Sequence, residues 1–176
     1  MLRYVILPAV LFVGVALAAD DKPAMKETAK NPGFEKLKSL AGDWLKLDDK
    51  GNPTDSVGLS FKVTSAGKAV QETIVPGQQM EMVTMYYVDG KDLKGVHYCA
   101  MGNQPHLKLD PSALPNTLKF DFDGGSNMDP AKDMHMHEGA YKIIDADHIE
   151  ASWQGYVNGK PAEGHGMTLK LVRKKK

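Results

Sequence analysis

Two histidines in the segment Met134-His135-Met136-His137-Glu138 have the most suggestive spacing in the chain. In an extended strand, residues two apart project from the same face, about 7 Å apart along the backbone. This spacing suits a single metal ion held by His135 and His137, because imidazole binds zinc, copper and iron, including the iron of haem. Met134 and Met136 carry thioethers, which favour Cu(I). Alternatively, both histidines are polar side chains satisfied by neighbours and water.

His97 and Cys99 repeat this spacing on another predicted strand. If the two pairs meet in the fold, three imidazoles and one thiolate surround a site that suits copper or zinc. The spacing leaves open whether they meet. Cys99 is the only cysteine, so an intramolecular disulfide is excluded, and taken alone it is equally well interpreted as a small buried side chain.

Methionine is abundant, with ten residues among the 176 of the chain. Because methionine is flexible and polarisable, this abundance is typical of a copper site, of an adaptable ligand cavity or of ordinary core packing. Aromatic residues on strands pack the core or line a pocket with their polar tips inward. The candidates for a ligand-binding interior are therefore His97, Cys99, His135, His137, Tyr86, Tyr141 and Trp153.

Motifs of common enzymes are absent from the sequence, and we assign no catalytic residue. The chain contains no glycine-rich phosphate loop, no serine nucleophile elbow and no His-Glu-x-x-His zinc motif. A hydrolase or isomerase that uses a pocket histidine as general base, with Glu72 or Glu138 nearby, is a third hypothesis without diagnostic spacing. The formal net charge of zero at pH 7 gives no attraction for polyanions, so we expect no nucleic-acid partner.

A period of two dominates the sequence after the first forty residues and defines the elements that must position these side chains. Apolar and polar residues alternate over 57–63, and similar short runs follow, separated by turn sequences such as Asp89-Gly90 and Asn158-Gly159. About ten strands result, with no helix long enough for a parallel crossover. Such a chain folds as a sandwich or closes as a barrel, because an open sheet leaves its edges exposed.

The N-terminal region indicates export. Residues 1–18 contain a short basic start, an apolar run and a small-x-small cleavage sequence, which together are typical of a signal peptide that is removed. The apolar run is too short for a membrane span of ~20 residues, so we expect a periplasmic or secreted protein without a membrane span. We expect residues 19–33 to form a flexible leader and residues 34–176 the folded domain. Phe34, Leu37 and Leu40 recur at helical spacing and predict a short capping helix.

Two features favour a barrel over a sandwich: Gly42-Asp43-Trp44 at the entry to the first strand, and Arg173 in the last. This pattern resembles that of the calycins, in which a Gly-x-Trp opens the first strand and an arginine of the last strand packs over the indole. The resemblance implies that Trp44 and Arg173 close the barrel, and such a cation–π contact contributes about 0.5–2 kcal/mol. The strand number resembles the fatty-acid-binding and nitrobindin-like calycins more than the eight-stranded lipocalins. Residues 97–105 also resemble exported bacterial proteins of unknown function.

The sequence therefore predicts an all-β protein, an antiparallel up-and-down β-barrel of about ten strands with a short N-terminal capping helix. By analogy with the barrels it resembles, we expect a non-enzymatic protein that binds a small apolar or amphipathic molecule. The alternative is a periplasmic protein that binds copper, zinc or haem through His135 and His137, with His97 and Cys99 as further ligands. The identity of the ligand and the oligomeric state stay open at this point.

Overall fold

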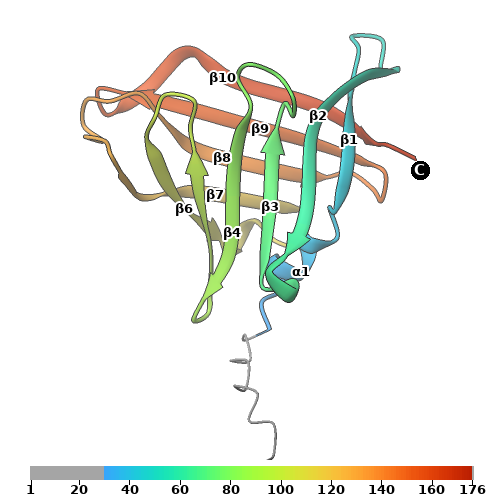
Figure 1. The fold of residues 1–176 in the computed structure, drawn as a ribbon, viewed down its shortest axis with the longest axis horizontal. Helices are drawn as coiled ribbons and strands as arrows, with labels where there is room; N and C mark the ends of the chain where they lie inside the picture. The colour runs from blue at the N-terminus through green and yellow to red at the C-terminus, as the bar shows by residue number, and fades with distance from the viewer. Residues whose placement is uncertain (1–29, 176) are drawn as a thin grey trace, which may run out of the picture.

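The computed structural model describes residues 30–175 of the chain, and within them ten antiparallel strands form one closed barrel (Figure 1). This confirms the predicted fold class. The expected signal peptide, residues 1–18, and most of the expected leader lie outside the described residues. The elements in chain order are α1 (Pro32–Lys38), β1 (Gly42–Leu47), β2 (Pro53–Thr64), β3 (Ala69–Ile74), β4 (Met82–Asp89), β5 (Asp92–Tyr98), β6 (Gln104–Asp110), β7 (Thr117–Ser126), β8 (His135–Ile143), β9 (His148–Val157) and β10 (Lys160–Arg173), with two short 3₁₀ turns at Ser65–Gly67 and Pro111–Ala113.

Each strand pairs with the next one in the chain, so the barrel has a simple up-and-down order. β1 also pairs with β10, where Trp44 lies opposite Arg173, and this pairing closes the sheet. Between β9 and β10, Asn158 and Gly159 have positive φ values of 54° and 68°. Two consecutive positive φ values are what a two-residue type I′ hairpin turn requires, as the Asn-Gly sequence predicts. The closed ten-stranded barrel is compatible with a calycin-like fold.

The helix α1 starts earlier than the sequence predicts, because it includes Pro32 and Gly33. The side chain of Asn31 accepts a hydrogen bond from the backbone N–H of Phe34 at 3.0 Å. Proline suits the first helical position, since its missing N–H needs no partner there. Asn-Pro-Gly is also typical of turns, which is why the sequence predicts a leader up to residue 33. In the fold, these residues instead cap and start the helix.

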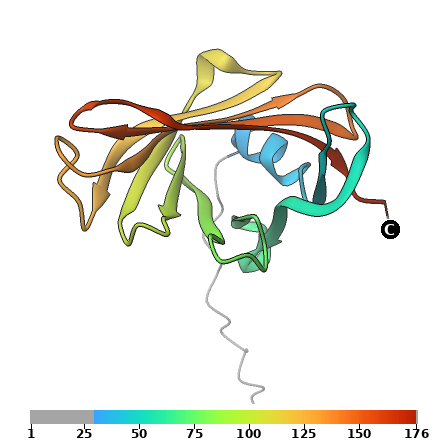
Figure 2. The ribbon, with the colours of Figure 1, turned by 90° about the horizontal axis from the view of Figure 1, so that it is seen from above.

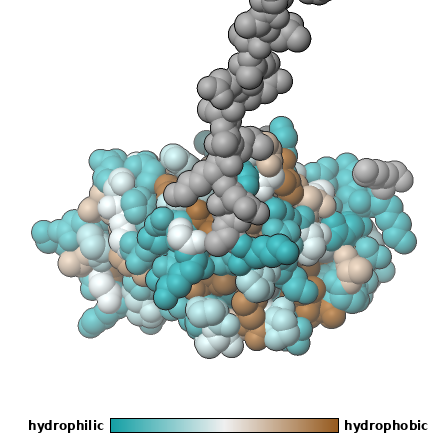
Figure 3. Space-filling model, turned by 90° about the horizontal axis from the view of Figure 1, so that it is seen from below, coloured by the Kyte–Doolittle hydropathy of each residue, from teal (hydrophilic) through white to brown (hydrophobic). Residues whose placement is uncertain are grey.

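The apolar side of α1 fills one end of the barrel, the lower end in Figure 1, and Figure 2 shows the helix within the ring of strands. Phe34, Leu37 and Leu40 are 3%, 0% and 2% exposed. Seen from below, the surface of the molecule is mostly hydrophilic, with scattered apolar residues (Figure 3). The helix thus caps the barrel as predicted. None of the helices within residues 30–175 has the length and apolar character that a membrane span would need.

Arg173 and Trp44 seal the barrel beside α1. The guanidinium carbon of Arg173 lies 4.3 Å from the centroid of the Trp44 ring, which is within the range of cation–π attraction. The guanidinium nitrogens also donate hydrogen bonds to the backbone carbonyls of Ser39, Ala41 and Ala146, at 3.0, 2.8 and 3.1 Å. One side chain therefore ties the last strand to the segment between α1 and β1, as the calycin resemblance implies.

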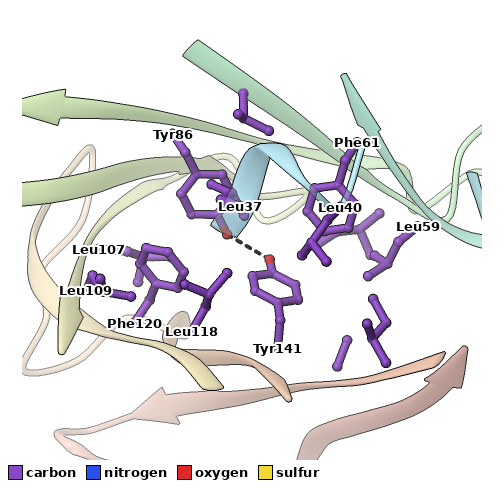
Figure 4. Close-up of a cluster of buried hydrophobic side chains, with 14 of the residues drawn as sticks. Leu37, Leu40, Leu59, Phe61, Tyr86, Leu107, Leu109, Leu118, Phe120 and Tyr141 are labelled. Carbon is purple, nitrogen blue, oxygen red and sulfur yellow. Dashed lines mark hydrogen bonds between the residues drawn. The ribbon is translucent and has the colours of Figure 1, made fainter. Parts of the chain in front are cut away.

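The barrel interior next to α1 is solidly packed (Figure 4). Tyr86, Phe120 and Tyr141 are almost completely buried. Ring centroids lie 4.8 Å apart for Tyr86 and Phe120 and 6.2 Å apart for Phe120 and Tyr141. The two tyrosine hydroxyls hydrogen-bond each other at 2.7 Å. Because this end is full, space for a ligand has to lie towards the other end of the barrel.

Candidate functional site

A pocket opens at the barrel end opposite α1, where β3 and β5 finish and β4 and β8 begin. Antiparallel neighbours that alternate in direction bring these strand ends together. The pocket has a volume of about 240 Å³. Its wall is rich in methionine and histidine and consists of Ile74, Met80, Met82, His97, Cys99, Ala100, Met101, Met134, His135, Met136, Trp153, Gln154, Gly155, His165 and Met167.

This wall is apolar and carries no formal charge from acidic or basic side chains. None of the described residues that line the pocket is Lys, Arg, Asp or Glu. Methionine, tryptophan and aliphatic residues make up most of the lining, and the polar side chains are three histidines and Gln154. A concave apolar surface with a few polar groups is typical of a site for a small organic molecule.

His97 is the most deeply placed polar side chain of the pocket wall. It is 0% exposed, and its Nδ1 lies 3.0 Å from the hydroxyl of Thr84. Its Nε2 has no hydrogen-bond partner among the described residues. Burial lowers the pKa of His97 to about 4, so the imidazole is neutral at pH 7. A buried nitrogen that lacks a partner costs about 1–3 kcal/mol, which a bound ligand can recover.

A row of cross-strand neighbours connects His97 to a buried carboxyl group. Glu72 on β3 lies opposite Thr84 on β4, and Thr84 lies opposite His97 on β5. Burial raises the pKa of Glu72 to about 7, although the neighbouring hydroxyls of Tyr141, Thr84 and Tyr86 oppose this rise. Tyr86 donates a hydrogen bond to one carboxyl oxygen at 3.2 Å. The other oxygen has no partner among the described residues.

His135 and His137 hydrogen-bond each other directly. His135 Nδ1 lies 2.8 Å from the backbone carbonyl oxygen of Asp133, and because a carbonyl only accepts, this nitrogen carries a proton. In the neutral ring, His135 Nε2 then accepts a hydrogen bond from His137 Nδ1, at 3.0 Å. Burial, and secondarily the neighbouring His135, lower the pKa of His137. The two histidines are thus partners of one another.

Because of a β-bulge, His135 and His137 do not form the simple same-face pair that their spacing predicts. The register between β8 and β9 shifts between Met136 and Glu138, so His137 is an extra residue and the alternation of faces is interrupted. His135 is 2% exposed and lines the pocket. The His137 ring instead stacks on Tyr156, with centroids 3.7 Å apart, and does not belong to the pocket lining.

The structure brings three of the four predicted metal ligands to one pocket: His97, Cys99 and His135. Within residues 30–175, however, no three or more His, Cys, Asp or Glu side chains are placed to hold a metal ion together. Zinc and Cu(II) depend on such ligands, whereas Cu(I) also accepts thioethers. The described residues therefore do not bring the predicted His and Cys ligands together as one metal site.

The three aromatic candidates separate into two groups. Trp153 is 7% exposed and lines the pocket. Tyr86 and Tyr141 lie in the packed interior between the pocket and α1, where their hydroxyls hydrogen-bond each other and that of Tyr86 also donates to the Glu72 carboxyl group. They belong to the support of the pocket rather than to its wall.

Two titratable residues of this region were outside the seven candidates for the ligand-binding interior, although Glu72 was named in the hydrolase or isomerase hypothesis. His165 lies between two glycines, a setting typical of a turn or of a flexible lid or rim, yet it belongs to β10 and lines the pocket. The sequence does contain a signal for Glu72, because alternation places it on the same inward face as Val70 and Ile74. A carboxyl group in a row of inward apolar residues has to be buried, and buried carboxyl groups need partners.

Comparisons with known proteins identify no family for this chain. No model of a known protein family matches the chain. The curated proteins include no significant match to its sequence.

Proposed function

We propose that this protein is an exported, calycin-like barrel that binds a small, largely apolar molecule in the pocket opposite α1. The supporting observation is the pocket itself, which measures about 240 Å³, has no charged side chain in its described lining and includes His97, whose Nε2 has no partner among the described residues. An apolar cavity of roughly 150 Å³ takes up benzene, and sites for drug-sized ligands begin near about 300 Å³. A molecule of one or two rings therefore fits.

The composition of the wall supports the same function. Six methionines line the pocket, and methionine adapts its shape to a ligand more readily than branched side chains do. The signal-like residues 1–18 support export to the periplasm or beyond. The closed barrel supports the role by analogy with the calycins.

Bromobenzene will quench the fluorescence of Trp153 but leave that of Trp44. The chain has two tryptophans, one in the pocket wall and one sealed under Arg173 at the opposite end. Quenching in a titration followed by emission is therefore expected to saturate before all emission is lost. The Cys99→Phe variant places a ring in the pocket and is expected to weaken binding at least about tenfold, which corresponds to ~1.4 kcal/mol.

The matched control is Tyr98→Phe, because Tyr98 is the preceding residue and is 51% exposed. Its titration should superimpose on that of the unmodified protein. Quenching that never saturates, or that is identical in the Cys99→Phe variant, would show that bromobenzene does not enter this pocket and would count against the proposed function.

Cu(I) is a second candidate ligand, because seven of the fifteen residues that line the pocket contain sulfur. The six methionines and Cys99 line the same pocket as His97, whose Nε2 has no partner among the described residues. Thioether, thiolate and imidazole are ligands that select Cu(I). The wall could thus hold a soft monovalent ion even though it lacks three His, Cys, Asp or Glu ligands in range of each other among the described residues.

Anaerobic titration with Cu(I), in competition with a chromogenic chelator, tests this candidate. If the pocket is a copper site, one equivalent of Cu(I) will be withdrawn from the chelator, and the His97→Leu and Cys99→Ser variants will each withdraw less. Zinc is expected to compete poorly because it does not use thioethers. A protein that leaves all Cu(I) on the chelator excludes the candidate, and the organic ligand then remains.

A further inference from the structure

We propose that the ligand of the pocket is a neutral molecule with a hydroxyl group, an alcohol or a phenol, whose O–H donates a hydrogen bond to Nε2 of His97. This inference rests on the proposed function and names the class of ligand for that same pocket. His97 would then be the residue that determines specificity.

The hydrogen bond on the far side of the ring decides which nitrogen is free to accept. Nδ1 of His97 lies 3.0 Å from the Thr84 hydroxyl, and Thr84 lies opposite the Glu72 carboxyl group on the neighbouring strand. The Thr84 hydroxyl stabilises the ionised form of Glu72, so its hydrogen points towards that carboxylate and its oxygen lone pairs point towards His97. Nδ1 then carries the proton and donates to Thr84, and Nε2 keeps its lone pair.

Nε2 belongs to a residue of the pocket wall and has no partner within the described part of the protein. His97 is 0% exposed and belongs to the pocket wall, and Nε2 is one of the buried side-chain atoms without a partner among the described residues. A site built to hydrogen-bond a ligand hydroxyl discriminates strongly against the analogue that lacks it, because the buried group is then left unpaired.

Charged ligands are disfavoured by the rest of the wall. A carboxylate head group would need a cation, and the described lining contains no Lys or Arg. An ammonium group would need an anion, and the described lining contains no Asp or Glu either. An ion buried without a partner is far more costly than a neutral hydroxyl that makes one hydrogen bond. The chemistry of the pocket thus favours a neutral ligand that carries a hydroxyl group on an apolar framework.

Three probes that share one ring system test the inference: 2-naphthol, naphthalene and 2-naphthoate. Calorimetric titration at pH 8 keeps naphthol neutral and naphthoate ionised. We expect naphthol to bind about 5- to 30-fold more tightly than naphthalene, the equivalent of the roughly 1–2 kcal/mol of one buried hydrogen bond. Naphthoate should bind most weakly of the three.

Two variants assign the preference to one nitrogen. His97→Leu should bind naphthol and naphthalene equally, with naphthalene affinity retained. His165→Leu is the matched control, because His165 lines the same pocket, and it should keep the preference for naphthol. A wild type that does not prefer naphthol, or that binds naphthoate best, overturns the inference but leaves a ligand pocket. If none of the three probes binds, the proposed function itself fails.

A measurement on the unmodified protein covers the case in which the His97→Leu variant does not fold. In ¹⁵N NMR at pH 8, Nε2 of His97 should have the shift of an unprotonated ring nitrogen and move upfield with naphthol but not with naphthalene. The opposite tautomer, with the proton on Nε2, would overturn the inference, because the pocket would then present a donor and not an acceptor.

Discussion

The Glu72→Gln variant will be more stable than the wild-type protein at pH 8 by about 3 kcal/mol, whereas the two proteins will be equally stable near pH 4. Burial raises the pKa of Glu72 from 4.5 to about 7. In the unfolded chain the group ionises near pH 4.5, so its contribution to stability is fully present below that pH and is lost as the pH rises to about 7. Glutamine keeps the shape and can still accept from Tyr86, but it never becomes charged.

His97 is expected to have the opposite pH dependence. Burial lowers its pKa from 6.5 to about 4, so the unfolded chain takes up a proton between these values while the folded protein does not. The contribution of His97 is present above pH 6.5 and falls by about 3 kcal/mol as the pH drops to 4. Because the two groups change in opposite directions over much of the same range, their effects largely cancel in the wild type.

Urea unfolding from pH 4 to pH 8 separates these two contributions. Relative to the wild type, Glu72→Gln should gain stability as the pH rises, and His97→Gln should gain stability as the pH falls. Other titrating groups cancel in the comparison, since they are common to all three proteins. Curves for both variants that run parallel to that of the wild type would mean that neither group is buried in the protonation state described above.

Leu37→Ala is expected to lower the free energy of unfolding by about 2–5 kcal/mol, the usual range for a large-to-small change in a core. Leu37 belongs to a helix of only seven residues, yet it is 0% exposed. Figure 4 shows it among side chains that come from different walls of the barrel. Truncation therefore leaves a cavity between the helix and the strands, which a rigid closed sheet cannot easily collapse to fill.

Chemical denaturation of Leu37→Ala beside Glu35→Ala checks this expectation. Glu35 lies on the exposed side of the same helix and forms a surface ion pair with Lys38, a kind of contact that contributes little to stability. The control should therefore unfold close to the wild type. If Leu37→Ala does the same, α1 is not a structural part of the barrel interior.

Most of the fold could be predicted because its signals are local. Alternation over residues 57–63 identified β2, and Asn158-Gly159 identified the turn between β9 and β10. The errors arose where one local signal has two meanings. Asn-Pro-Gly starts a helix as readily as it makes a turn, and the glycines around His165 are typical of a turn although β10 runs through them from Lys160.

The site was harder to predict because its residues meet only in the closed barrel. His97 and His135 lie on β5 and β8, which are not neighbours in the sheet, so no spacing in the sequence indicates that they share a pocket. His137 was misleading for a different reason, since a bulge shifts it out of the alternation that the prediction depends on. The identity of the candidate residues was readable from the chain, but their grouping was not.

The pairing of β1 with β10 also determines when the barrel can close during synthesis of the chain. The bond from Arg173 to Ala41 joins residues 132 positions apart, and contacts of such long sequence separation form slowly. During synthesis, β1 keeps an unpaired edge until the tenth strand has emerged. A chain cut before β10 would not give a smaller barrel, but an open sheet with two exposed edges, which is a template for association with other chains. The nine pairings between consecutive strands therefore form a closed barrel only after β10 has been synthesised and has paired with β1.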